Sequence, residues 1–231
     1  MKKNILLIGG SYGIGQKIAS LMQEGHHVIV AARTAEHIPE GVTYQQFDVA
    51  TDAIEDLDLP EQIDGFVYCP GSINLKPFRA LKPEIIQKDL DINFMGLVRC
   101  IHGILPKLKK SDAPSLVFFS TVAVKVGMPF HTSVAAAKGA IEGFAKSLAA
   151  EFAPRFRVNV IAPSLTDTPL ADKLLSSEEK KERMGQRHPL QRVGSVDDIA
   201  TMAVFLLEDK SSWMTGQILG VDGGMSTLNV N

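Results

Sequence analysis

The sequence predicts an α/β domain in which a doubly wound parallel sheet is covered by helices on both faces. Short apolar runs recur along the chain, and such runs are typical of strands buried on both faces of a parallel sheet. Segments whose apolar residues have helical spacing separate most of these runs. Strands that alternate with helices connect through right-handed crossovers, and such connections produce a doubly wound sheet.

Length and composition fit one soluble domain. The 231 residues contain no internal repeat and no linker-like tract, so we expect residues 1–231 to form a single domain. A formal net charge of −2 favours neither a nucleic-acid nor an anionic-membrane partner. Cys69 and Cys100 are too few for a disulfide framework or a metal site, and we predict no bound metal.

The chain shows no targeting or membrane segment. Residues 1–8 pass directly into an apolar strand pattern without the apolar region and cleavage site of a signal peptide. No apolar run approaches the roughly 18 residues that span a bilayer. We therefore expect a cytoplasmic protein without a membrane partner.

The first strand, residues 5–8, runs into a glycine-rich turn that predicts a phosphate-binding loop. Gly9 permits a sharp turn, Gly13 lets backbone amides approach a pyrophosphate, and Gly15 lets helix and strand pack closely. The helix N-terminus then offers unpaired N–H groups and the positive end of its dipole to phosphates. An ordinary strand–helix turn is the alternative. The helix is expected to bury Ile18, Leu21 and Met22.

The second strand, residues 27–32, ends next to a basic residue. In the usual dinucleotide pattern an acidic residue here accepts the ribose hydroxyls of NAD. This sequence has Ala32, followed by Arg33 and Thr34. An arginine can pair with a 2′-phosphate, so the sequence predicts NADP(H) rather than NAD. The alternative is a solvated charge at a strand end.

The remaining strands are expected at residues 42–47, 63–69, 115–119, 157–163 and 217–221. A long helix should follow Pro83, with Ile85, Ile86, Leu90, Phe94, Leu97, Val98 and Ile101 inward. Further helices are predicted at about residues 133–153 and after the N-cap candidate Ser195. The polar segment 164–192 is predicted to be a mobile lid over the substrate.

Ligands bind at the carboxyl ends of the strands in such sheets. This rule places the glycine turn, Gly71, Thr121 and Pro163 on one edge of the molecule. Together with the loop at 72–82, the lid residues 165–192 should line a substrate pocket.

The glycine spacing Gly-x-x-x-Gly-x-Gly resembles the short-chain dehydrogenase/reductase family. Further matches are Asn93, Lys138, residues 157–163 and residues 215–224, so the resemblance covers nearly the whole chain. The pattern is most like that of the 3-oxoacyl-carrier-protein reductases. The resemblance implies a Rossmann-like NADP-binding domain that transfers hydride between a nicotinamide and a substrate carbonyl carbon.

In that family a tyrosine donates the proton, a lysine four residues later lowers its pKa, and a serine binds the substrate oxygen. Lys138 matches the lysine, Thr121 stands at the serine position, and Asn93 matches an asparagine that kinks its helix and holds a water in a proton relay. The glycine-rich turn and the resemblance to this family together predict cofactor contacts at Gly9, Ser11, Tyr12, Gly13, Ile14, Gly15, Arg33, Thr34, Asp48, Val49, Gly71, Lys138, Pro163, Thr166 and Thr168.

Several positions depart from the family pattern or have a second interpretation. Asp48 matches an aspartate that contacts adenine, but a turn-forming aspartate is equally consistent with the sequence. Residues 68–71 read Tyr-Cys-Pro-Gly where the family has Asn-Asn-Ala-Gly, and Ser164 replaces a glycine. The tyrosine position itself is Val134, which has no proton to donate.

Three explanations for Val134 stay open. In the first, a substitute donates the proton: His131 is the leading candidate because histidine titrates near neutrality, and Ser133 and Tyr68 are weaker ones. Alternatively, reduction of a conjugated C=C bond can take its proton from water, with Lys138 and Thr121 orienting the ligand. The third explanation is a nucleotide-binding protein without turnover, acting as a sensor or structural subunit.

The sequence thus predicts an NADPH-dependent reductase with an atypical active site. Its substrate would be a carbonyl or conjugated enoyl compound, either a small molecule or an acyl thioester. The resemblance implies a homotetramer or homodimer that pairs the helices carrying Asn93 and Lys138. Small residues on the second helix, such as Gly139 and Gly143, suit close helix packing, although exposed small residues in a good helix former are the alternative.

Overall fold

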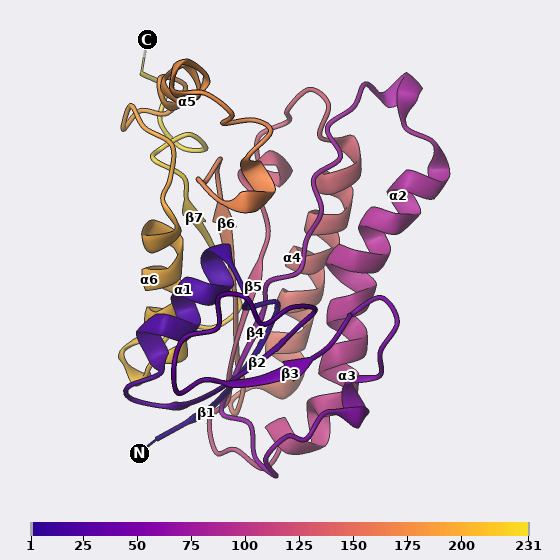
Figure 1. Ribbon diagram of the computed structural model, residues 1–231, viewed down its shortest axis with the longest axis vertical. Coiled ribbons are helices and arrows are strands. Elements are labelled where there is room, and N and C mark those ends of the chain that lie inside the picture. The colour runs from indigo at the N-terminus through magenta and orange to yellow at the C-terminus, as the bar shows by residue number, and fades with distance from the viewer. Residues whose placement is uncertain (1, 231) are drawn as a thin grey trace.

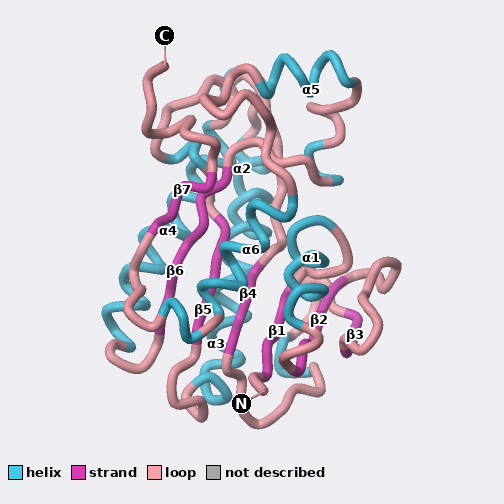
Figure 2. Tube along the Cα trace, turned by 90° about the vertical axis from the view of Figure 1, so that its left-hand side faces the viewer, coloured by secondary structure: helices cyan, strands magenta, loops and turns pink. Residues whose placement is uncertain are grey.

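The fold is that of a computed structural model, which describes residues 2–230. Its described residues form a seven-stranded parallel sheet in the order β3-β2-β1-β4-β5-β6-β7, which Figure 2 shows from one side. The strands are β1 Asn4–Ile8, β2 His27–Ala32, β3 Thr43–Gln46, β4 Gly65–Tyr68, β5 Ser115–Phe119, β6 Arg157–Pro163 and β7 Ile218–Val221. The predicted doubly wound parallel sheet is confirmed.

Helices cover both faces of the sheet (Figure 1). Helices α1 and α6 lie on one face, and α2, α3 and α4 lie on the other. The helices are α1 Gly13–Met22, α2 Pro83–Leu90, α3 Gly96–Leu108, α4 Thr132–Phe152, α5 Glu178–Gly185 and α6 Val196–Leu207. Ser195 caps α6 as the sequence predicts, because its hydroxyl accepts from Asp198 N while Ser195 N donates to the Asp198 carboxylate.

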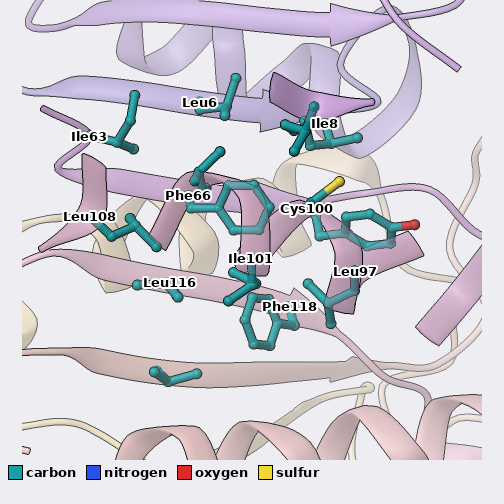
Figure 3. Packing of buried hydrophobic residues seen from close by; sticks show 14 of the residues in the cluster. Leu6, Ile8, Ile63, Phe66, Leu97, Cys100, Ile101, Leu108, Leu116 and Phe118 are labelled. Atoms are coloured by element: carbon teal, nitrogen blue, oxygen red, sulfur yellow. The ribbon is translucent and has the colours of Figure 1, made fainter. Parts of the chain in front are cut away.

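The sheet separates two hydrophobic cores. Side chains alternate along a strand, so Leu6 and Ile8 of β1 pack toward α3 and α4 in the core of Figure 3, whereas Ile5 and Leu7 pack toward α1 and α6. Both faces of the strand are buried, which explains why strand sequences are continuous apolar runs.

One inward residue of α1 was predicted incorrectly. Ile18 and Met22 are buried, but Leu21 is 45 % exposed. Residues 18, 19 and 22 complete the buried stripe of this short helix, and position 21 falls beside the stripe.

The long helix expected after Pro83 is interrupted by a π-helical turn, Asp91–Met95, between α2 and α3. Asn93 Nδ2 donates to Asp89 O at 2.8 Å. In an α-helix that carbonyl would accept from the backbone N–H of Asn93, so the side chain displaces the backbone bond and the turn widens. In α2 the fully buried residue is Asp89, whereas the predicted Ile85 and Ile86 are only partly buried.

The polar segment 164–192 lies beyond the carboxyl ends of the strands, with α5 at its outer edge (Figures 1 and 2). It contains a 3₁₀ turn, Pro169–Ala171, and α5, whose N-cap Ser177 accepts from Lys180 N. Its function as a mobile lid stays a prediction. Within residues 2–230 no helix is both long and apolar enough to cross a membrane.

Candidate active site

A cavity of about 620 Å³ opens at the carboxyl ends of β1, β2 and β4. The strand order reverses between β1 and β4, and ligands bind in the crevice at such a switch point. Of the predicted cofactor contacts, the cavity wall contains Gly9, Ser11, Tyr12, Gly13, Ile14, Gly15, Arg33, Thr34, Asp48, Val49, Gly71 and Thr168.

The glycine turn has the geometry of a phosphate cradle. Gly9 and Gly13 have φ of 77° and 62°, a region that favours glycine. A Cβ on Gly15 would lie 2.3 Å from Gly9 O, so only glycine allows this approach of helix and turn. Helix α1 has no side-chain cap and no acidic residue in its first turn, so its N-terminal N–H groups are free to meet an anion.

The rim of the cavity next to β2 carries one positive and one negative side chain, Arg33 and Glu36. Arg33 is exposed, forms no ion pair within residues 2–230, and its Nη2 lies 3.5 Å from the Tyr12 hydroxyl. Glu36 lines the same cavity. A guanidinium favours a 2′-phosphate and a carboxylate favours ribose hydroxyls, so these two side chains oppose each other in cofactor choice.

Asp48 supports both interpretations of its position. Its carboxylate accepts from Ala50 N at 3.0 Å, and its backbone N donates to Asp52 Oδ2 at 2.7 Å, as in a turn-forming aspartate. Asp48 also lines the nucleotide cavity. The turn therefore holds the carboxylate at the cavity wall.

A second cavity of about 290 Å³ continues from the first, and we call it the substrate cavity. Both are lined by Ile14, Cys69, Gly71, Thr168 and Leu170. The predicted residues Thr121, His131, Lys138, Pro163 and Thr166 line the substrate cavity, as do Val134 and Ser164. The structure thus brings most of the predicted catalytic residues to one cavity, and Asn93 lies just behind its wall.

Lys138 and Val134 lie one turn apart on α4 and face this cavity together. Val134 is 6 % exposed and Lys138 is 9 % exposed. The Lys138 ammonium forms no ion pair within the described chain, and burial lowers the pKa of Lys138 to about 8. At neutral pH the cavity therefore holds a charged amine where the tyrosine hydroxyl is missing.

Gly71 separates two of the polar groups. A Cβ on Gly71 would lie 3.3 Å from Asn93 Oδ1 and 3.6 Å from Lys138 Nζ. A side chain at this one matching position of the 68–71 segment would therefore press on Asn93 and come into ordinary contact with Lys138.

The Thr121 hydroxyl can donate to a ligand, whereas Nε2 of His131 can donate only when the ring is protonated at both nitrogens. The Thr121 hydroxyl accepts from Ala123 N at 3.3 Å, which leaves its own hydrogen free. His131 Nδ1 lies 2.7 Å from the carbonyl oxygen of Pro129, so Nδ1 carries the donating hydrogen and Nε2 is left for another partner.

The two weaker proton-donor candidates face away from the cavity. Tyr68 is 2 % exposed and its hydroxyl donates to Ile92 O at 2.6 Å, on the side of the α3 core. Burial raises the pKa of this phenol well above its usual range. Ser133 is fully buried and donates to Asp89. Neither hydroxyl lines the substrate cavity.

A buried carboxylate that the sequence analysis missed holds the cavity wall in place. Asp89 Oδ1 accepts from Ser72 Oγ at 2.5 Å and from Asn74 Nδ2 at 2.7 Å, while Oδ2 accepts from Ser133. Asn93 Nδ2 donates to Ser72 Oγ at 2.9 Å. The sequence did contain a signal for this residue. Asp89 precedes Asn93 by one helical turn and lies on the face that was predicted to be apolar, where an acidic residue is unexpected.

The segment after β6 holds a second missed residue. His188 is 3 % exposed; its Nδ1 donates to Met184 O at 3.0 Å, and its Nε2 lies 2.8 Å from Ser164 Oγ. The Thr166 hydroxyl donates to Ser164 O at 3.0 Å. Thr168 lines both cavities.

These features fit a nicotinamide nucleotide. The turn admits a pyrophosphate, Arg33 can meet a 2′-phosphate, and Gly71, Thr168 and Lys138 lie where the two cavities join. Within residues 2–230 no three His, Cys, Asp or Glu side chains gather as metal ligands.

Comparison with known proteins identifies the family. A family model described as enoyl-(acyl carrier protein) reductase matches residues 9–226. The chain is 30% identical over 244 residues to the 3-oxoacyl-[acyl-carrier-protein] reductase FabG of Staphylococcus aureus, covering 97% of this chain and 98% of that protein. The chain belongs to the short-chain dehydrogenase/reductase family. It is thus a member of a family of oxidoreductases, and the resemblance read from its motifs is confirmed.

Solved structures of the family agree with this fold. The aldohexose dehydrogenase of Thermoplasma acidophilum, in ligand-free form, superposes with a TM-score of 0.91 at 26% identity, covering 100% of this chain and 97% of that chain. ElxO with NADP bound superposes with a TM-score of 0.89 at 26% identity, covering 99% of this chain and 100% of that chain. These two structures share the fold that positions both cavities.

Proposed function

We propose that the protein is an NADPH-dependent reductase of a carbonyl or conjugated enoyl substrate that works with a non-standard proton donor. The observation that carries the proposal is the continuity of the two cavities. The nucleotide cavity ends at Gly71 and Thr168, and the substrate cavity begins there with Lys138 and Thr121 in its wall. A nicotinamide at this junction would face a bound substrate.

Relatives support the choice of cofactor and substrate class. The similar FabG proteins are 3-oxoacyl-[acyl-carrier-protein] reductases, and ElxO has been solved with NADP bound. An ElxO variant with phenylalanine in place of a tyrosine has been solved with NADPH bound. A member of the family therefore binds its nucleotide after losing a tyrosine hydroxyl, which supports nucleotide binding beside Val134.

Three polar residues of the substrate cavity have distinct roles in the proposed reaction. Bound NADPH supplies a hydride to a substrate carbon. Thr121 donates a hydrogen bond to the substrate oxygen, and the Lys138 ammonium stabilises the negative charge that develops there. His131 in its imidazolium form gives the Nε2 proton to the reduced substrate, becomes the neutral Nδ1–H ring that donates to Pro129 O, and recovers a proton from solvent.

We further propose that the protein assembles as a homodimer or homotetramer through α4. Gly143 is exposed and a Cβ there would have no heavy atom within 4 Å, while Gly139 has only Val124 near it. This face therefore has room for a second backbone to approach.

One observation favours a second candidate function. Val134 fills the position of the general acid with a methyl-bearing side chain, so a protein that binds NADPH without turnover is the alternative. Such a protein would act as a nucleotide sensor or a structural subunit. Binding and turnover measured separately distinguish the two functions.

The first experiment is a fluorescence titration with NADPH and NADH. We expect tight NADPH binding and weak NADH binding, because Arg33 can meet the 2′-phosphate. Arg33→Gln should remove the preference, and Glu36→Gln should strengthen it. Failure of the parent protein to bind either nucleotide would reject the proposed function and its alternative together.

Turnover is then tested with NADPH against a ketone panel and enoyl thioesters. Lys138→Ala should abolish turnover while the far-ultraviolet circular dichroism stays native, and His131→Ala should lower the rate and remove a pH dependence near neutrality. A parent protein that binds NADPH tightly and reduces neither substrate class would support the sensor function instead. Recovery of turnover in Val134→Tyr would show that only the donor is missing.

A further inference from the structure

The charged side chains that line the substrate cavity are positive, and the nearest carboxylates, Asp89 and Glu142, accept from the wall residues Ser72 and Ser120. Among the residues that the structure describes, its wall contains the cations Lys138 and Arg187 and no aspartate or glutamate. Apolar side chains supply most of the remaining wall, among them Ile73, Leu75, Met128, Leu174 and Met225. Low-dielectric walls strengthen the field of a charge inside a cleft, so this cavity favours an anion held against apolar groups.

The backbone on either side of Arg187 is hydrogen-bonded to neighbouring residues. Helix α5 ends at Gly185, after which Arg187 N donates to Met184 O at 3.3 Å and His188 N donates to Gly185 O at 2.9 Å. The buried His188 ring is held at both nitrogens, by Met184 O and Ser164 Oγ. Arg187 therefore occupies a defined place at the exposed rim of the substrate cavity.

The Arg187 guanidinium has no anionic partner within residues 2–230. Its contact is Nη1 to the weak acceptor Sδ of Met184, at 3.6 Å. Arg192, five residues later, instead forms a bidentate pair with Asp198 at 2.6 and 2.8 Å. A permanently charged fork of N–H donors, placed at the cavity rim and left without an acid, is suited to bind a carboxylate or phosphate.

We propose that Arg187 binds an anionic group of the substrate, a carboxylate or a phosphate, while the apolar wall holds the hydrocarbon part. This inference rests on the proposed reductase function and names the class of substrate: an apolar oxo or enoyl compound that carries a negative charge away from its reacting carbon. The anion could be a carboxylate of the substrate itself or a phosphate of a pantetheine thioester.

The test measures binding, because binding does not depend on turnover. Protein saturated with NADP⁺ is titrated by calorimetry with 6-oxoheptanoate and with the neutral 6-oxoheptanamide, and in parallel with the trans-2-hexenoyl thioesters of 4′-phosphopantetheine and of neutral pantetheine. A parent protein that prefers the charged member of at least one pair by about tenfold or more supports the proposal. The pair that shows the preference identifies the source of the anion.

Variants assign the preference to Arg187. Arg187→Gln should weaken binding of the charged ligand to the level of its neutral partner and leave the neutral ligand unchanged, and Arg187→Lys should restore part of the loss. Arg183→Gln is the matched control, because Arg183 is an exposed arginine of α5 outside the cavity wall. It should behave as the parent protein.

Three results would overturn the inference: equal affinity within both pairs, a preference that survives in Arg187→Gln, or no binding of any of the four ligands to protein that has bound NADP⁺. A protein that does not bind NADP⁺ would instead contradict the proposed function. The same four ligands would then be titrated against the nucleotide-free protein. The same results would show whether Arg187 binds the anionic group of the ligand.

Discussion

Val134 changes the environment of its neighbour Lys138. A tyrosine hydroxyl at position 134 would be a polar partner one turn from the Lys138 ammonium. Valine supplies only methyl groups, and no carboxylate of the described chain pairs with this amine. The charge is therefore buried without an acid, and burial lowers the pKa of Lys138 to about 8. Retention of such a charge costs stability, so we interpret Lys138 as a functional residue.

This cost predicts that Lys138→Met stabilises the nucleotide-free protein at pH 7, by on the order of 2 kcal/mol. The native lysine loses its proton as pH rises through about 8, whereas the unfolded lysine keeps it until about pH 10.4. Between these values the unfolded state binds more protons, so the stability of the parent protein increases with pH. The advantage of the variant should shrink over that range.

Urea unfolding at pH 7, 8 and 9.5 measures this difference. Lys146→Met on the same helix is the matched control, because Lys146 is exposed and its substitution should change stability little at any of these pH values. A parent protein more stable than Lys138→Met at pH 7 would show that the amine has a stabilising partner.

Among the secondary-structure elements, the π-helical turn between α2 and α3 is stabilised by side-chain hydrogen bonds. The Asn93 side chain donates to the Asp89 carbonyl oxygen in place of a backbone N–H. The Asp89 carboxylate in turn accepts hydrogen bonds from Ser72, Asn74 and Ser133. These donors come from the loop after β4 and from the first turn of α4. One fully buried carboxylate therefore fixes the loop, the widened helix and the start of the helix that carries Lys138.

We predict that Asp89→Ala destabilises the protein by roughly 2 to 4 kcal/mol, because it leaves the buried Ser133 hydroxyl and two partly buried donors, Ser72 and Asn74, without their acceptor. It should also weaken NADPH binding, since Gly71 and Lys138 would lose their fixed positions. Thermal unfolding and NADPH titration measure the two effects.

Asp91→Ala is the control for this prediction. Asp91 lies two residues later in the same helix and accepts from Gln87 Nε2 in an exposed hydrogen bond. Its loss should cost about 0.5 kcal/mol or less. Equal stability of the two variants would contradict the structural role of Asp89.

For the whole molecule, the strand order determines where chemistry can occur. The order in which the chain adds strands to the parallel sheet reverses between β1 and β4. The nucleotide and substrate cavities meet beside this switch point, at Gly71. The open face of α4 at Gly143 lies outside both cavities. Assembly through this face would therefore leave the entrance to the active site free.

We predict that the parent protein is a dimer or tetramer and that Gly143→Glu reduces its mass toward that of the monomer. A side chain at position 143 meets no heavy atom within 4 Å in the isolated chain, so the substitution should leave the protomer folded and interfere only with a close helix pair. Light scattering after gel filtration gives the mass, and circular dichroism checks the fold. An unchanged oligomeric mass would show that the interface does not include the face of α4 at Gly143.

Much of this architecture could be predicted from the sequence because its causes are local. Strands β5 and β6 were predicted with their observed bounds, since apolar residues dominate both runs, although β6 also buries Arg157 and Asn159. The glycine turn was equally readable, because the positive φ of Gly9 and Gly13 and the close packing of Gly15 each require a residue without a side chain. The pairing of Val134 with Lys138 followed from helical spacing.

Tertiary structure alone decided which polar groups face the substrate. Tyr68, Ser133 and His131 were all possible proton donors in the sequence, but the first two point into buried networks and His131 lines the cavity. Asp89 and Arg187 could not be assigned either. Asp89 acquires its donors from the loop after β4 and from α4, and Arg187 reaches the cavity because His188 is held by Ser164. Local periodicity reports which face of an element is buried, whereas the partners of a polar side chain depend on how distant elements pack together.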